Sequence, residues 1–140
     1  MKILLAVDGS EIGLSAVRHV VALSKALSAV PKLTLLYADP PLLKSVAVEL
    51  GVEGVARYHA ENGEYALKKA KAALKRAQLA FTERVLVSEP AAAIVKQAKA
   101  DKADLIVMGS HGRGALKSLF VGSVAMKVIG TSTVPVTVTR

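Results

Sequence analysis

Glycine and serine residues at fixed spacing follow one apolar run near the end of the chain. Gly109 and Gly112 come directly after Leu105-Ile-Val-Met108, and Gly122-Ser123 opens the next helical pattern. Glycine lets the backbone approach a phosphate closely, and the N–H groups and dipole of a helix start attract the anion. The spacing predicts a phosphate-binding turn, in which Ser123 either caps the helix or donates its hydroxyl to the ligand.

Two other phosphate-binding motifs do not fit this segment. Gly109 and Gly114 have P-loop spacing, but Ala115-Leu116 stands where lysine and serine or threonine are needed. The dinucleotide motif is also incomplete, because Lys117 stands where its third glycine belongs. We therefore expect neither a Walker-type magnesium site nor hydride transfer.

The elements that position this turn follow from the apolar pattern. Strands are predicted at five short runs, residues 3–7, 33–37, 84–87, 105–108 and 134–138. The first four are continuous rather than alternating, which is typical of strands covered on both faces. Helical spacing predicts helices at 10–27, with Ser10 as cap, and at 64–81, 91–100 and 124–129. This alternation predicts an α/β fold, an open and mostly parallel sheet with helices on both faces.

Two segments depart from this regular pattern. Between Pro40 and Tyr58, Gly51 and Gly54 weaken any helix, so we expect a loop and a broken helix that covers part of one sheet face. In the last run, Val134, Val136 and Val138 alternate with Pro135 and two threonines, and a proline indicates an edge strand. We expect two copies to pair through this edge as a homodimer.

Composition limits the class of protein. A chain of 140 residues is expected to form one domain, residues 1–140, and 52% hydrophobic residues exclude a disordered chain. No apolar run is long enough for a membrane span, no export signal is visible and cysteine is absent, so we expect a cytoplasmic protein without membrane partners. The net charge of +8 raises a polyanion as partner.

The spacing Gly109-x2-Gly112-x9-Gly122-Ser123 resembles the nucleotide-binding signature of the universal stress protein family, in its ATP-binding branch. The opening residues 3–10, the block 103–112 and the closing Val134-Pro-Val are similar to landmarks of that family, so the resemblance covers the whole chain. It implies strand order 3-2-1-4-5 and a ligand at the carboxyl ends of the first and fourth strands, where the order reverses.

What the resemblance implies for the site is a set of positions. Asp8 is expected at the adenine and ribose end, Ala38 on the base and Met108-Gly109 along the ribose. The expected phosphate contacts, made mostly by backbone N–H groups, are Gly112, Gly122, Ser123 and Val124. Apart from the resemblance, Arg113 and Lys117 follow the glycines and either reach phosphate oxygens or are solvated. ATP or AMP is the expected ligand, with Mg²⁺ as a candidate companion. One departure is Ser88-Glu89-Pro90, where relatives often carry glycine first and where the glutamate would repel a triphosphate if it faced the site.

Several alternatives remain open at this point. From the residues alone Asp8 is equally explained as a helix-capping residue, whereas the resemblance favours ligand contact. His111 lacks an identifiable carboxylate to orient it as a base. No catalytic residue and no metal ligand set is assigned. The function expected is a dimeric, stress-responsive module that binds adenine nucleotides. The alternatives are weak ATP hydrolysis or autophosphorylation, and polyanion binding. Nucleic acid is not the expected partner, because the five cations of residues 68–76 fit the solvent face of a helix.

Overall fold

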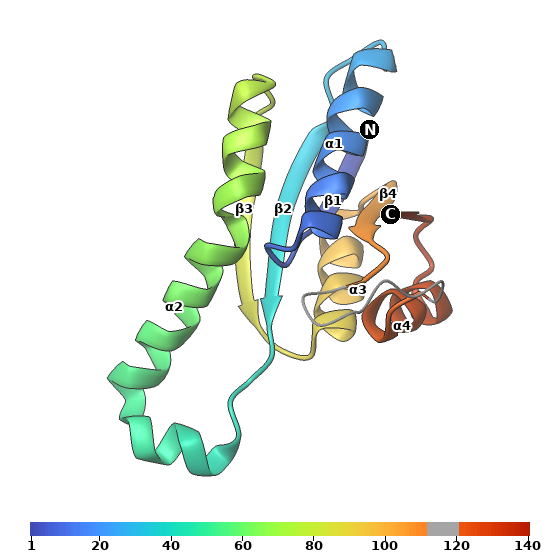
Figure 1. Cartoon of the computed structure of the whole chain (residues 1–140). Coiled ribbons are helices and arrows are strands. Elements are labelled where there is room, and N and C mark those ends of the chain that lie inside the picture. Colours follow the sequence, from blue (N-terminus) through green and yellow to red (C-terminus); the bar gives the residue numbers. More distant parts are fainter. Residues whose placement is uncertain (112–120) are drawn as a thin grey trace.

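The computed structural model of the chain describes residues 1–111 and 121–140, in which strands and helices alternate (Figure 1). The strands are β1 (Lys2–Ala6), β2 (Lys32–Asp39), β3 (Phe81–Val87), β4 (Leu105–Gly109) and β5 (Val136–Thr139). The helices are α1 (Glu11–Ala26), α2 (Lys44–Arg76), α3 (Pro90–Asp101) and α4 (Ser123–Thr131). The alternation confirms the predicted α/β class.

The strands form one parallel sheet in the order β3-β2-β1-β4-β5. The predicted order is therefore confirmed. The register places Ile3 of β1 beside Leu33 of β2 and Leu105 of β4, so apolar side chains form rows across the sheet. The order reverses between β1 and β4, and a crevice opens at their carboxyl ends because their connections leave toward opposite faces.

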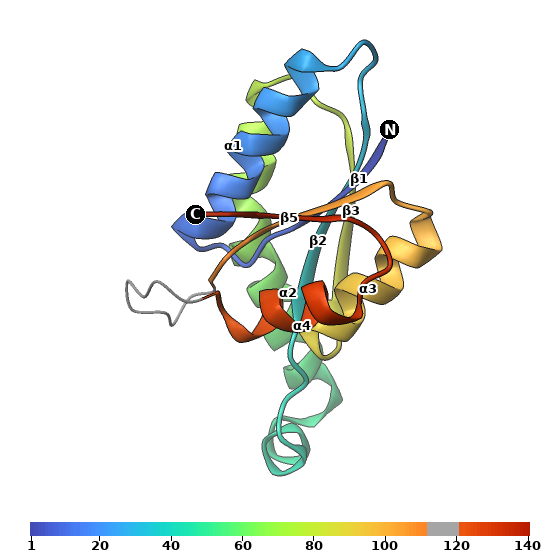
Figure 2. The same ribbon diagram turned by 90° about the vertical axis from the view of Figure 1, so that its right-hand side faces the viewer.

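Helices cover both faces of this sheet (Figure 2). The core on the α1 and α2 face contains Leu5, Leu35 and Leu67, and the core on the α3 and α4 face contains Leu4 and Ile106. Leu4 and Leu5 are neighbours in β1 but belong to different cores, which explains why its apolar run is continuous. Burying each such side chain stabilises the fold by about 1.5–3 kcal/mol.

The long helix α2 differs from the helix predicted over residues 64–81. It begins twenty residues earlier, at Lys44, and it is broken at Gly51, whose φ of 68° and ψ of 174° are not helical. The break was expected, but the loop before the helix comprises only residues 40–43. The chain turns at Gln78, with φ of 56°, and Phe81 then pairs with Leu33 as the first residue of β3. Phe81 therefore belongs to a strand, because ladder pairing with β2 prevails over its helical spacing.

The segment from residue 40 to residue 58 projects away from the sheet. It contains no buried residue, and Figure 1 shows this end of α2 extending past the carboxyl ends of β2 and β3. The expectation that it covers part of a sheet face is wrong, because the segment lies beyond the ends of the strands.

The remaining boundaries shift by a few residues. β3 begins at Phe81 rather than at residue 84, and β5 begins at Val136 rather than at Val134, so Pro135 precedes the strand instead of interrupting it. β5 pairs with β4 alone and lies at the sheet edge, as predicted. Across residues 1–111 and 121–140, no helix combines the length and apolar character that a membrane span requires.

Candidate ligand site

A cavity of about 500 Å³ lies at the carboxyl ends of β1 and β4, where the strand order reverses. Seven of the predicted site residues line it, namely Asp8, Ala38, Met108, Gly109, Gly122, Ser123 and Val124. Gly112 and Arg113 lie outside the described residues. The cavity volume falls in the range of small-molecule sites. The fold therefore brings the seven described site residues together around one cavity, although they lie up to 116 positions apart in the sequence.

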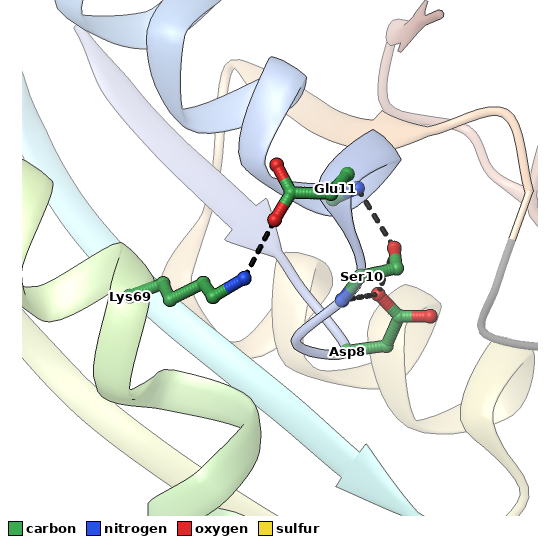
Figure 3. Close-up of polar contacts among 5 residues, drawn as sticks. Asp8, Ser10, Glu11 and Lys69 are labelled. Atoms are coloured by element: carbon green, nitrogen blue, oxygen red, sulfur yellow. Dashed lines mark hydrogen bonds and ion pairs between the residues drawn. The ribbon is translucent and has the colours of Figure 1, made fainter.

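Asp8 is held in place by the turn that follows β1. Its Oδ1 accepts hydrogen bonds from the Ser10 N–H at 3.0 Å and from the Ser10 hydroxyl at 2.6 Å (Figure 3). The Ser10 Oγ in turn accepts from the Gly13 N–H at 2.9 Å and caps α1. Ser10 is therefore the capping residue, as predicted, and Asp8 orients the cap while its carboxylate lines the cavity.

Gly13 is a cavity residue that the sequence analysis did not single out. A Cβ at this position would lie 2.9 Å from Asp8 Oδ1 and 3.3 Å from Ser10 Oγ. A side chain there would displace the carboxylate, so the observed Asp8 turn favours glycine in the first turn of the helix. The available signal was the pattern Asp8-x-Ser10-x-x-Gly13, in which each residue contacts the next.

The start of α4 supplies hydrogen-bond donors at one end of the cavity. Gly122 is the N-cap, and its N–H donates to the Ser110 carbonyl at 2.6 Å. The alternative that Ser123 caps the helix is therefore wrong, because Ser123 is already its first helical residue. The N–H groups of Ser123, Val124 and Ala125 have no acceptor within the helix, since the first helical bond is from Met126 to Gly122. The backbone donors that this segment offers to a ligand are thus the N–H groups of Ser123, Val124 and Ala125, because the Gly122 N–H already donates to Ser110.

Two glycines of the signature are needed for close packing of backbone against backbone. A Cβ at Gly122 would lie 3.0 Å from the Ser110 carbonyl oxygen, and one at Gly109 would lie 3.0 Å from the backbone of Ile12. Gly109 therefore lets α1 approach β4, and Gly122 lets α4 approach the turn after β4. Both glycines shape the cavity because they allow these elements to pack closely, in addition to any contact with a ligand.

Ser110 and His111 also line the cavity and were not in the predicted set. Ser110 is 1% exposed, and its Oγ lies 2.8 Å from His111 Nδ1. The sequence analysis set His111 aside because no carboxylate was identifiable nearby. The structure pairs it with a serine hydroxyl instead, which fixes one ring nitrogen toward the protein.

The Ser88-Glu89-Pro90 turn does not direct its charge into the cavity. Glu89 caps α3, because its Oε2 accepts from the Ala92 N–H at 2.8 Å, and its Oε1 lies 3.5 Å from Lys127 Nζ. The hydrogen bond from the Ala92 backbone holds the pKa of Glu89 below its ordinary value. Pro90 lines the cavity and Glu89 does not. The backbone of Ser88 does not have positive φ, so this turn does not need glycine.

A buried polar cluster supports the β2 side of the cavity. Asp39 is 3% exposed and lies between Ala38 and Pro40, both of which line the cavity. Its carboxylate accepts from the Tyr37 hydroxyl at 2.8 Å, from Asn62 at 3.0 Å and, from Nδ1 of His59, at 2.6 Å. Burial opposes ionisation, but these three hydrogen bonds together hold the pKa of Asp39 below its ordinary value. No sequence spacing indicated this cluster, because Asp39 and His59 are twenty residues apart.

Cations of residues 68–76 are used to join elements. Lys69 on α2 lies 2.6 Å from Glu11 at the first turn of α1 (Figure 3), and Lys71 lies 2.6 Å from Glu83 on β3. The hydrogen bond from Lys69 lowers the pKa of Glu11. Both ion pairs fit the interpretation of this run as the solvent face of a packed helix.

The cavity as a whole suits a ligand with an apolar ring system and an anionic end. Leu36, Ala38 and Ile94 supply apolar wall, and the start of α4 supplies amide donors. Among the described lining residues, Asp8 is the only carboxylate and there is no lysine or arginine. The described residues also contain no group of three or more histidine, aspartate or glutamate side chains that could hold a metal ion. Within the described lining, the donors available to an anionic group are therefore mainly the N–H groups at the start of α4, without a lysine or arginine charge.

The parallel strand order and the cavity at its reversal point define a doubly wound α/β domain with a candidate ligand site. A model of the universal stress protein family matches residues 1–140, and the chain belongs to that family. It is 34% identical to universal stress protein MJ0531 of Methanocaldococcus jannaschii, over 99% of this chain and 81% of that protein. The solved structure of MJ0577, from the same organism, matches with a TM-score of 0.80 at 29% identity, over 99% of this chain and 94% of that one.

A further solved structure is a universal stress protein in complex with cAMP. It matches with a TM-score of 0.71 at 25% identity, covering 100% of this chain and 97% of that chain. The resemblance inferred from the glycine spacing and the strand landmarks is thereby confirmed at the level of family and fold.

Proposed function

We propose that the chain is a nucleotide-binding module of the universal stress protein family that takes ATP, AMP or a related adenine nucleotide in the β1–β4 cavity. The observation that carries this proposal is the placement of the α4 amide donors and the Asp8 carboxylate on one cavity of about 500 Å³. The relative solved with cAMP supports the same ligand class. Occupancy of the cavity would signal stress in the cytoplasm.

The proposed orientation follows from the chemistry of the walls. The base packs on Ala38, the ribose lies along Met108-Gly109, and a ribose hydroxyl donates to the Asp8 carboxylate. The phosphates lie at the start of α4, where Ser123 and Val124 donate through their N–H groups and the helix dipole adds attraction. Gly112 and Arg113 are proposed as further phosphate contacts. A Mg²⁺ ion carried by a triphosphate would keep most of its water ligands, as is usual for this ion.

A thermal-shift titration with ATP and AMP tests the proposal. Ligand at a hundred times Kd stabilises the native state by about 2.7 kcal/mol, which corresponds to a rise in Tm of roughly 10 °C for a domain of this size. Guanosine triphosphate is the matched control for phosphate binding without adenine recognition. No rise in Tm at millimolar adenine nucleotide, with a folded sample, contradicts the proposal.

We also propose a homodimer through the outer edge of β5. The carbonyls of Pro135 and Thr139 face β4, where they accept from Ile106 and Ser110. The backbone groups of Val136 and Val138 therefore point outward, because alternate residues of a strand face opposite neighbours. The side chains of Val134, Val136 and Val138 pack on the α3 and α4 core, so the contact between copies would be a backbone ladder.

The substitution Val136→Pro tests the dimer by removing one outward N–H. We expect light scattering at micromolar concentration to give a dimer for the unmodified chain and a monomer for Val136→Pro. The matched control Val136→Ala keeps the N–H and stays dimeric. A monomeric mass for the unmodified chain disproves the interface.

Slow hydrolysis of ATP is a second candidate, and the position of His111 favours it. The ring lines the cavity beside the start of α4, and the Ser110 hydroxyl, 2.8 Å from its Nδ1, holds it in place. No described carboxylate orients the ring, so turnover would be weak. Single-turnover product analysis should show His111→Ala and Gly122→Ala slower than the unmodified chain. Equal rates in all three would assign the activity to a contaminant.

A further inference from the structure

Seven cations that the sequence scatters lie at one end of the sheet. They are Lys2, Lys25, Lys32, Lys75, Arg76, Lys99 and Lys102, and all seven are exposed. In a parallel sheet every strand begins at the same edge, and the preceding helix ends there. Lys2 and Lys32 are directly paired at the starts of β1 and β2. Lys25, Lys75, Arg76 and Lys99 occupy the last turns of α1, α2 and α3. We name these seven residues the basic edge.

Acidic residues near the basic edge are few and already engaged. Asp101 accepts from Thr34 at 2.8 Å and from Gln97 at 2.8 Å, and Asp104 accepts from the Lys2 N–H at 2.7 Å. The seven cations and these two carboxylates together carry a net charge of +5, which is most of the net charge of +8 of the chain. The ligand cavity does not use this charge, because it lies at the opposite ends of the strands and its described lining contains no lysine or arginine.

Helix stability explains only part of this cluster. Cations in the last turn of a helix complement its dipole, which accounts for the residues on α1, α2 and α3. Lys2 and Lys32 begin adjacent strands, where two like charges repel each other. Lys102 follows α3 with a φ of 51°, a left-handed conformation that glycine adopts at less cost. The dipole effect therefore does not account for Lys2 or Lys32, although Lys2 Nζ donates to the Asp101 carbonyl at 3.1 Å, and Lys102 adopts its conformation at a cost to the fold.

The geometry points to a binding site for the phosphate backbone of double-stranded nucleic acid at the basic edge, without sequence specificity. The edge runs across the starts of β3, β2, β1 and β4, which at about 4.8 Å per strand span about 14 Å. A duplex of that length carries about eight phosphate charges. The edge therefore matches a duplex in charge and in extent.

The side chains at the basic edge favour a duplex over the other polyanions. Single strands are held by stacking on aromatic rings, but Phe81, at the start of β3, packs against the core. Membrane surfaces are bound by an apolar face, and among the described residues only Met1 and Val30 are large apolar side chains exposed near this edge. The expectation that nucleic acid is not a partner rested on residues 68–76 as the solvent face of a helix, and on the few aromatic residues (2 Phe, 3 Tyr and no Trp), which bear on single strands. The fold adds cations from four other segments to the end of that run.

Fluorescence anisotropy with a random duplex of about 30 base pairs, between about 50 and 200 mM salt, tests the site. Five to seven phosphate contacts predict a slope of log K against log salt of about −5. The edge variant combines Lys25→Gln, Lys32→Gln and Lys102→Gly. We expect its slope to be shallower by about 2.7, and its affinity at the lowest salt to fall at least about tenfold.

The matched control removes three exposed cations elsewhere, through Lys44→Gln, Lys68→Gln and Lys96→Gln. We expect its slope to change by less than about 1, because the lost charges do not touch the duplex. Equal losses in the two triple variants would show that net charge alone acts and would overturn the site. Absence of duplex binding by the unmodified chain at about 50 mM salt would also overturn it.

Vesicles with about 30 mol% phosphatidylserine distinguish a membrane from nucleic acid. Edge-dependent vesicle binding without duplex binding would contradict the proposal. The ATP-induced thermal shift, measured on the same variants, should equal that of the unmodified chain. A loss of edge binding and a loss of nucleotide binding are therefore separately visible.

Discussion

Gly13→Ala should affect both the stability of α1 and the ligand site that this helix helps to form, and the two effects can be measured separately. Alanine is favoured over glycine in a helix interior by about 1 kcal/mol. The new Cβ would lie 2.9 Å from Asp8 Oδ1, and ordinary contact begins at 3.4 Å, so the carboxylate oxygen must retreat by 0.5 Å. It then loses at least one of its two bonds to Ser10, and a hydrogen bond to a charged group contributes about 1.5–3 kcal/mol.

The two effects predict a net fall in unfolding free energy of about 0.5–2 kcal/mol for Gly13→Ala. The matched control is Gly130→Ala, since Gly130 also lies in a helix but a Cβ there meets nothing within 4 Å. We expect this control to raise the unfolding free energy by up to about 1 kcal/mol. Chemical denaturation followed by circular dichroism measures both values.

Nucleotide affinity gives the second readout for this pair. If Asp8 accepts a ribose hydroxyl, its displacement should weaken ATP binding about tenfold in Gly13→Ala, which is about 1.4 kcal/mol. Gly130→Ala should leave the affinity unchanged. If Gly13→Ala gains stability as the control does and its ATP affinity is unaltered, the role assigned to Asp8 and its turn is refuted.

Three further predictions concern the supports of the fold. Asp39→Asn should lower the unfolding free energy by about 3 kcal/mol in urea denaturation, because it breaks a buried charged cluster. The folded pKa of Asp39 lies below its unfolded value. The stability that Asp39 contributes is therefore present above about pH 4 and is lost as the pH falls through the folded pKa. An unfolding free energy that does not change over this pH range would contradict the prediction. Lys102→Gly should raise the unfolding free energy by about 1 kcal/mol, since glycine adopts φ of 51° without strain, and a decrease would argue against that strain. Gly51→Ala should strain a backbone position almost exclusive to glycine, so hydrogen exchange in residues 44–58 should become faster while Tm changes little, because nothing in that segment is buried.

The sequence alone determined the features that depend on neighbours in the chain. Continuous apolar runs indicated strands buried on both faces, and the hydroxyl of Ser10 indicated where α1 begins. The glycine spacing after β4 predicted a ligand site there, and Gly109 and Gly122 of that pattern line the cavity. These signals are local, because caps, turns and periodicity involve residues only a few positions apart.

Tertiary structure decided the features that join distant segments. The spacing that placed Phe81 on a helix gave way to its pairing with β2, and the segment up to residue 58 passed beyond the sheet instead of covering it. Asp39 pairs with His59 and Asn62 on α2, a helix whose start and path the sequence did not predict. The basic edge exists only because a parallel sheet places the starts of all its strands, and the ends of the preceding helices, at one end of the molecule. Charge that is spread along the sequence thus becomes concentrated in space, and the order of the strands decides which charges meet.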